Sequence, residues 1–259
     1  MVGAGRHKTG FLKRKTHIFK NFADIVSMKN RIFTVILIFL TISVFFACEK
    51  KDDQQSQAEP KGFTFFNIGA NTVLTSKIEK ELEVKLGNSV TERWSTIDLT
   101  THYNGFLQQY FKDLYELHKK LRTDLVLKIE DNPIKLTYRH TRQTPFEYVE
   151  LIFSSHSRKP LLFKIRSEQG GPAVIDEIKK KHGEPKIIVW DEKAAYGKKG
   201  RSSYWQNDKD IFMISVIPDR YEKPEYYITI YYVGNMEEEL RIKQEKQKAQ
   251  KNDRVKNAF

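Results

Sequence analysis

The side chains that could do chemistry in this 259-residue chain are scattered along the sequence. A serine nucleophile usually stands on a sharp strand-to-helix turn of the pattern G-x-S-x-G, and the sequence contains no such pattern. Two hydroxyls lie beside a histidine at Ser154-Ser155-His156. Neighbouring residues of a hairpin point to opposite faces, so this adjacency does not predict a nucleophile with its base.

Metal and phosphate chemistry is not predicted either. The part of the sequence after residue 48 contains five histidines: His102, His118, His140, His156 and His182. No two of them are four residues apart and no H-E-x-x-H occurs, so we interpret them as surface or rim residues. Asp208 and Asp210 flank Lys209 in an expected turn, and Gly197-Lys198-Lys199-Gly200 lacks the Ser or Thr of a phosphate loop. We expect no catalytic residue, no metal ligand and no cofactor site.

The only thiol of the chain, Cys48, stands in a context that predicts lipid attachment. Sixteen residues without a charge, 32–47, lead directly into it, after Lys29 and Arg31. As a helix this run would be about 24 Å long, short of the roughly 30 Å of a hydrocarbon core. That length is typical of the core of a signal peptide. Ala47 is small enough for the narrow pocket of a signal peptidase, and Cys48 can form a thioether to diacylglycerol.

Residues 28–48 resemble the export signals of bacterial lipoproteins. The usual pattern has a leucine-like residue three positions before the cysteine and two small residues next; here these positions hold Phe45, Phe46 and Ala47. The resemblance implies a mature protein that begins at Cys48, carries fatty acyl groups such as palmitate, and is tethered outside the cytoplasm. The alternative is an uncleaved signal anchor. Residues 1–31 carry eight Lys or Arg and one Asp, which keeps this end cytoplasmic in both cases.

The charge of the chain is concentrated in the part before Cys48. The whole chain is +12; residues 1–47 carry +7 (eight basic, one acidic), which leaves +5 for residues 48–259. A charge of +5 is a weak indication of nucleic-acid binding, and we expect no nucleic-acid partner. It is compatible with loose attraction to anionic lipid. The expected partners are the membrane, through the lipid anchor, and a protein of the cell envelope.

The sequence divides into five segments. The first is an upstream extension, with Met28 as the true start of the protein; a long basic leader is the alternative. A signal peptide, a lipid-anchored polar tether, a globular domain, and a charged C-terminal helix and tail follow. These segments cover residues 1–27, 28–47, 48–61, 62–234 and 235–259.

Hydrophobic spacing predicts an α+β fold. Helical spacing follows a capping box at Ser76 and Glu79, recurs over 104–121 and again after Gly171, and a last helix is expected to be capped by Asn235. Alternating patterns predict strands, listed here by range: 89–99, 125–129, 134–140, 146–154, 160–166, 186–190, 202–206, 210–217 and 226–233. We expect a largely antiparallel sheet with two or three helices on one face.

Two halves of the domain share a pattern at an offset of 96 residues. Gly87 aligns with Gly183 and Trp94 with Trp190, each tryptophan seven residues after a glycine that ends a helix. This favours two tandem units of about 62–140 and 141–234, although helix–Gly–strand units are common by chance. The segment 172–185 is similar to the small modules of β-lactamase inhibitor protein and of envelope lipoproteins that assist outer-membrane protein assembly. That resemblance implies a binding module and assigns no binding residue.

Tyrosine pairs in the last strand are the candidate partner surface. Tyr226-Tyr227 and Tyr231-Tyr232 place aromatic rings on both faces of one strand. One face is expected to pack on the core and the other to present a partner surface, unless a helix covers it. Our main hypothesis is a non-enzymatic, protein-binding envelope lipoprotein. The alternatives are a lipid-anchored hydrolase with unrecognised residues and a carrier of a small apolar ligand.

Overall fold

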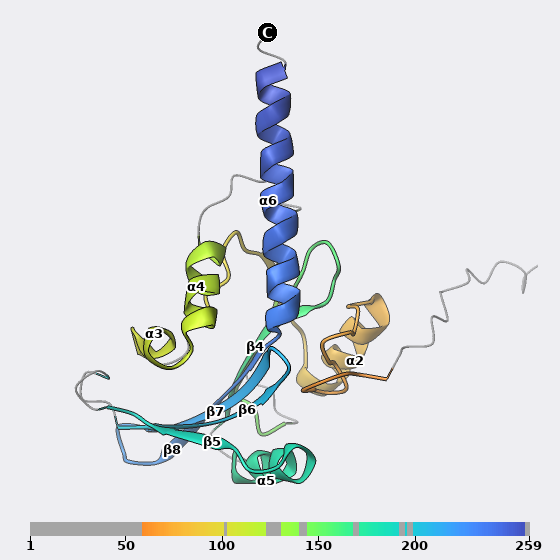
Figure 1. Cartoon of the computed structure of the whole chain (residues 1–259). Coiled ribbons are helices and arrows are strands. Elements are labelled where there is room, and N and C mark those ends of the chain that lie inside the picture. The colour runs from red at the N-terminus through yellow and green to blue at the C-terminus, as the bar shows by residue number, and fades with distance from the viewer. Residues whose placement is uncertain are drawn as a thin grey trace, which may run out of the picture. The chain divides into compact units, whose positions relative to one another are not determined.

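The structure is a computed structural model of the whole chain (Figure 1). It describes residues 59–100, 103–122, 131–139, 144–167, 171–191, 195 and 199–256. The chain divides into two compact units, Met1–Ser56 and Gln57–Phe259, and every described residue belongs to the second. The expected signal peptide, Cys48 and the strand expected at 125–129 therefore lie outside the described residues.

Eight strands form one antiparallel sheet, in agreement with the expected α+β fold. Its spatial order is β1-β2-β3-β4-β8-β7-β6-β5. The strands are β1 (Val90–Arg93), β2 (Ile134–Arg139), β3 (Tyr148–Phe153), β4 (Pro160–Ser167), β5 (Lys186–Val189), β6 (Arg201–Asn207), β7 (Asp210–Pro218) and β8 (Pro224–Tyr231). All neighbouring pairs are antiparallel.

Five described helices cover both faces of this sheet, so the expectation of helices on one face is not confirmed. They are α2 (Ser76–Leu86), α3 (Phe106–Tyr110), α4 (Lys112–Leu121), α5 (Gly171–His182) and α6 (Val233–Lys256). Buried residues of α2 and α5 belong to one hydrophobic core, and those of α3, α4 and α6 to another. Strand side chains alternate between two faces, which is why one sheet can support two cores.

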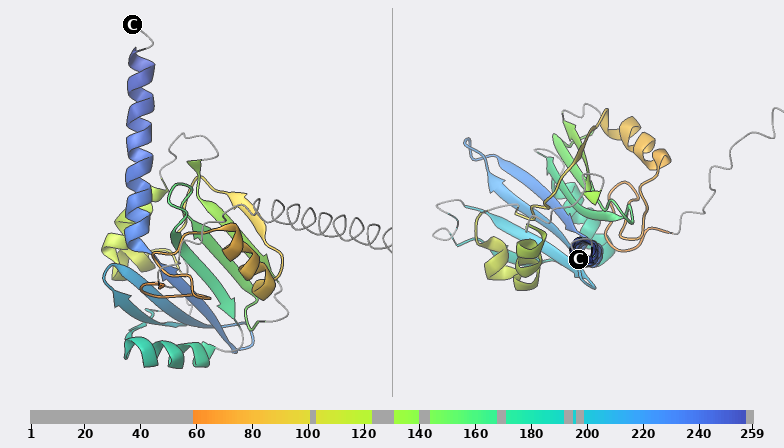
Figure 2. Two further views of the ribbon diagram at one scale, coloured as in Figure 1. Left: turned by 90° about the vertical axis from the view of Figure 1, so that its right-hand side faces the viewer. Right: turned by 90° about the horizontal axis from the view of Figure 1, so that it is seen from above.

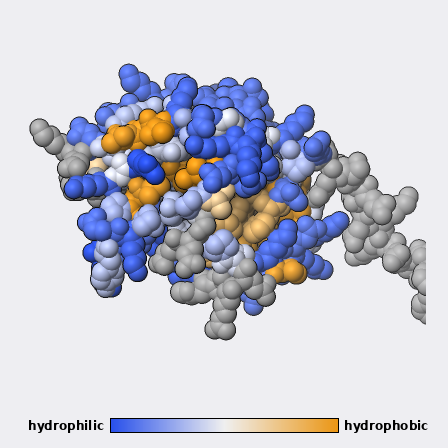
Figure 3. Space-filling view, turned by 90° about the horizontal axis from the view of Figure 1, so that it is seen from below, coloured by the Kyte–Doolittle hydropathy of each residue, from blue (hydrophilic) through white to orange (hydrophobic). Residues whose placement is uncertain are grey.

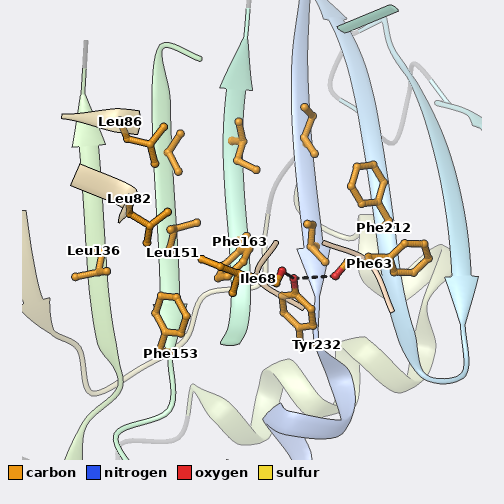
Figure 4. Packing of buried hydrophobic residues seen from close by; sticks show 14 of the residues in the cluster. Phe63, Ile68, Leu82, Leu86, Leu136, Leu151, Phe153, Phe163, Phe212 and Tyr232 are labelled. Atoms are coloured by element: carbon orange, nitrogen blue, oxygen red, sulfur yellow. Dashed lines mark hydrogen bonds between the residues drawn. The ribbon is translucent and has the colours of Figure 1, made fainter. Parts of the chain in front are cut away.

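The first core lies between the sheet and α2 with α5 (Figure 4). From the sheet it takes alternate residues such as Leu151, Phe163 and Phe212, and α2 adds Leu82 and Leu86. The loop before α2 closes this core. The buried hydroxyl of Tyr232 lies 3.2 Å from the backbone oxygens of both Phe63 and Ile68, which fixes that loop to the end of β8.

The second core lies on the opposite face, under α3, α4 and the start of α6. Its centre is aromatic: the buried Trp190 packs at 5.4 Å from Tyr103 and 6.0 Å from Phe106, measured between ring centroids. The Trp190 indole donates a hydrogen bond to Ser202 Oγ at 3.0 Å, which satisfies its only polar atom. The C-terminal part of α6 extends away from the sheet (Figures 1 and 2).

The helix expected over 104–121 is interrupted. It forms α3 and α4, which are separated at Phe111, where φ is −137° and ψ is 68°. The Phe111 ring contacts Tyr204 at 5.0 Å between centroids. In a continuous helix the apolar side chains would form one straight stripe. The break at Phe111 lets both short helices pack on the same aromatic core.

The caps of the first and last helices differ from those expected. Thr75, not Ser76, caps α2, because its hydroxyl accepts the N–H of Ile78 at 3.3 Å. Helix α6 begins at Val233, two residues before the expected cap Asn235. The carboxylate of Asp210, on β7, accepts the backbone N–H groups of Val233 and Gly234. Asn235 instead donates to the backbone oxygens of Ala70 and Pro160, 2.8 Å each.

Asp210 should give the domain a pH-dependent stability. Burial raises the pKa of its carboxyl from 3.8 to about 6. Between pH 3.8 and about 6 the folded chain holds a proton that the unfolded chain has lost. Protonation of this carboxyl therefore stabilises the fold at low pH, and that stabilisation is lost as the pH rises through about 6. Asp210→Asn cannot take up this proton. Urea unfolding at pH 7, 6, 5 and 4 would measure the free energy of unfolding of both proteins. We expect this free energy to rise in the natural protein relative to the variant as the pH falls, by at most about 1.4 kcal/mol per pH unit. A difference that stays constant from pH 7 to pH 4 would contradict this.

Candidate functional site

The serine and histidine at 154–156 form an anchor for α6 and not a catalytic pair. Ser154 is buried and donates to Oε2 of the buried Glu239 at 2.6 Å. The same hydroxyl oxygen accepts the backbone N–H groups of His156 and Ser157 at 3.1 and 3.0 Å. The His156 ring lies beside Lys246, its Nδ1 3.4 Å from Nζ. The hydroxyl therefore donates to a carboxylate, and no imidazole of the described residues forms a hydrogen bond with it.

A buried ion pair supports this anchor. Lys243 Nζ lies 4.0 Å from Glu239 Oε1, and both side chains are at most 5% exposed. Burial lowers the pKa of Lys243, while the nearby Glu239 carboxylate raises it in part. One turn further on, Lys246 Nζ contacts Asp131 Oδ1. Charges removed from water need such partners, so the start of α6 is held to the sheet by polar groups as well as by Met236.

The other histidines and carboxylates are also dispersed. His118 is buried with its Nε2 3.1 Å from Asp98 Oδ1, an ion-pair distance without hydrogen-bond alignment. His182 packs on Phe63 at 4.8 Å between ring centroids. His102 and His140 lie outside the described residues. Within the described ranges, no group of three His, Cys, Asp or Glu could hold a metal ion.

The four tyrosines in and directly after β8 have different environments, and three of them belong to the cores. Tyr231 and Tyr232 are fully buried, and the Tyr231 hydroxyl donates to the backbone oxygen of Leu99 at 3.2 Å. Tyr226 packs against Gly171 at the start of α5. Tyr227 alone is half-exposed on the second face without belonging to either core. The expectation that Tyr231 could present a partner surface is wrong, because the segment through Leu99 covers it.

Tyr227 belongs to a row of alternating arginine and tyrosine that crosses four neighbouring strands. The pairing registers place Arg139 opposite Tyr148, Tyr148 opposite Arg166, and Arg166 opposite Tyr227. Residues directly opposite each other in antiparallel strands point to the same face, with Cβ atoms about 5 Å apart. We call these four residues the arginine–tyrosine row. Both arginines are exposed and both tyrosines half-exposed.

Carboxylates hold the row in place. The Tyr148 hydroxyl donates to Glu150 at 2.8 Å and the Tyr227 hydroxyl to Glu225 at 2.5 Å. Arg166 Nε lies 3.1 Å from Glu147 Oε2. Burial, together with the neighbouring carboxylate, raises the pKa of Tyr148 and of Tyr227 to about 12. Both phenols therefore stay neutral at physiological pH.

Such a row can bind but does not by itself react. Tyrosine and arginine combine a flat apolar surface with a polar end, and both are enriched in the parts of protein interfaces that contribute most to affinity. Arginine also stacks on aromatic rings and binds carboxylates with two hydrogen bonds. Sequence reasoning identified Tyr227 but missed its three partners, because their alignment depends on register.

Comparisons with known proteins do not assign the row to a family: no family model, no curated protein and no solved structure matched the chain. In the described part of the chain, no helix is both long and apolar enough to cross a membrane.

Stability measurements should distinguish Tyr227, a residue of the row, from Tyr231, a core residue of the same strand. Tyr231→Glu would bury a carboxylate at a position with no exposed surface, and we expect the domain not to fold. Tyr227→Glu should change the free energy of unfolding by less than about 1 kcal/mol. Urea unfolding followed by the fluorescence of the buried Trp190 and Trp205 measures both. Equal loss in the two variants would show that Tyr227 is a core residue.

Proposed function

We propose that this chain is a lipoprotein of the bacterial cell envelope whose domain binds another envelope protein. Cys48 would carry the acyl groups, and the domain would work on the non-cytoplasmic side of a membrane. The uncharged run 32–47 directly before the only cysteine supports the anchor. The observation that carries the binding role is the arginine–tyrosine row on the sheet.

The composition of the row favours a protein partner. Its cations are the two exposed arginines, which alternate with the two neutral phenols along the row. Strand pairing fixes the backbone beneath the row, on both sides at Tyr148, Arg166 and Tyr227 and on one side at Arg139. Because the tyrosine hydroxyls are already held by Glu150 and Glu225, little side-chain freedom would be lost on binding. A rigid, mixed aromatic and charged surface of this kind suits a folded protein surface.

We also propose that the domain arose from two tandem units. The offset of 96 residues carries β1 onto β5 and Ser76–Leu86 onto the helix that ends at His182. Gly87 and Gly183 both end their helices with a positive φ, 88° and 79°. With the boundary placed between β4 and α5, and not near residue 140 as expected from the sequence, each unit is a helix followed by four antiparallel strands, and the two helices share one face of the sheet. The helices of the opposite face, α3, α4 and α6, would be additions to this plan.

The alternative functions have less support. A lipid-anchored hydrolase would need a nucleophile and a base in contact, and Ser154 is instead bonded to Glu239. A carrier of an apolar ligand would need a closed cavity. The hollow beside α2, lined by Phe66, Ile78 and Leu82 among others, has a volume of about 30 Å³, room for about two water molecules.

Cross-linking in living cells tests the binding role. A C-terminally tagged chain would be cross-linked in its natural host, and the captured proteins identified by mass spectrometry. We expect one dominant envelope protein, and we expect Tyr227→Glu to reduce its recovery at least about tenfold, as loss of a central interface residue does.

Tyr221→Glu is the matched control, because Tyr221 is an exposed tyrosine outside the row. It should leave the recovery unchanged. Equal recovery with Tyr227→Glu, or no reproducible partner for the natural chain, would contradict the proposal.

A further inference from the structure

Strand β5 forms one end of the sheet, and no other described strand pairs with its outer edge. Among the described residues it pairs only with β6. The N–H of Trp190 bonds to the oxygen of Gly200, which fixes the alternation of hydrogen bonds along this pair. Every second residue of an antiparallel edge strand turns its backbone groups outward. The outward groups are therefore those of Ile187 and Val189, two N–H donors and two C=O acceptors.

The side chains at this edge are apolar and exposed. Ile187 is 62% exposed and Val189 is 75% exposed, and both project from the same face, opposite Ser203 and Arg201. This is the face of the first core, on which α5 lies. Figure 3 shows the molecule from the side of α5, where hydrophobic surface is broken into separate patches between hydrophilic residues. An edge that offers both unpaired backbone groups and apolar side chains is a template for another strand.

The opposite end of the sheet is protected. At the offset of 96 residues, Thr91 and Arg93 of β1 stand where β5 has Ile187 and Val189. Beside them, Lys135 Nζ lies 3.7 Å from the centre of the Trp94 ring and 2.8 Å from Glu92 Oε2. Polar and charged side chains are a usual protection of sheet edges. Val90 at the start of β1 and Trp94 directly after its end are exposed, so the contrast with β5 concerns the two positions whose backbone groups turn outward.

Cations mark both ends of the open edge. Lys186 is the first residue of β5, and Arg201 stands opposite Val189 at the other end; both are exposed. A segment with a carboxylate near each end would complement these charges.

We propose that the β5 edge binds an extended segment of another protein by strand addition. The segment would have apolar side chains at two alternate positions, to contact Ile187 and Val189, and an acidic residue on either side. Backbone hydrogen bonds would supply affinity and the alternate side chains specificity. This surface is separate from the arginine–tyrosine row, and its test does not depend on that row.

The probe is a fluorescent seven-residue peptide of alternating valine and threonine with a glutamate at each end. Fluorescence anisotropy would measure its binding to the full chain in detergent. We expect saturable binding, weakened at least about tenfold by the double change Ile187→Thr and Val189→Arg, which copies the protected β1 edge. Val84→Thr is the control, since Val84 is an equally exposed valine on α2. It should leave binding unchanged, as should Tyr227→Glu.

A peptide with alternate backbone nitrogens methylated keeps the side chains but cannot pair as a strand, and it should not bind. Equal binding of this peptide would show simple hydrophobic contact and overturn the proposal. Absence of saturable binding, or unchanged binding to the double variant, would do the same. Sedimentation of the full chain tests the remaining occupant: a dimer that the double variant abolishes would assign the edge to a second copy and overturn the assignment to another protein.

Discussion

The rest of this domain depends on the pairing of β4 with β8. Six residue pairs, from Leu162 with Tyr231 to Ser167 with Tyr226, join strands β1–β4 to strands β5–β8. Without this pairing each half would be a four-stranded sheet with a long, apolar, open edge. The same strands also join the two cores, because Phe163 and Leu162 of β4 project to opposite faces. β8 then leads directly into α6 through Tyr232.

Much of the fold could be predicted because its signals are local. Alternating hydrophobicity located most of the strands, and a glycine with positive φ ends the first helix at Gly87, as its position indicates. What failed depends on residues distant in sequence. Asp210 of β7 caps α6, a contact that no pattern around Asn235 could reveal. Phe111, where the expected helix breaks, likewise packs on Tyr204, which belongs to the other half of the chain.

The candidate site was only partly predictable for the same reason. Successive side chains of a strand alternate between the two faces of the sheet, so Tyr227 and Tyr231, four residues apart, lie on one face. The sequence alone therefore could not distinguish them. The structure does, because a segment that passes over the sheet covers Tyr231 and leaves Tyr227 half-exposed. The row itself requires the registers of three strand pairs. A register shift of one residue in any of them would turn its side chains to the opposite face.

The anchor decides in which compartment both proposed binding surfaces would meet their partners, which makes it the central claim. The intact mass of the protein purified from the membranes of its natural host tests it most directly. We predict a chain that begins at Cys48 and carries two or three fatty acyl groups, enough apolar surface for stable attachment. A species that retains Phe46, or an unmodified Cys48, would contradict the account.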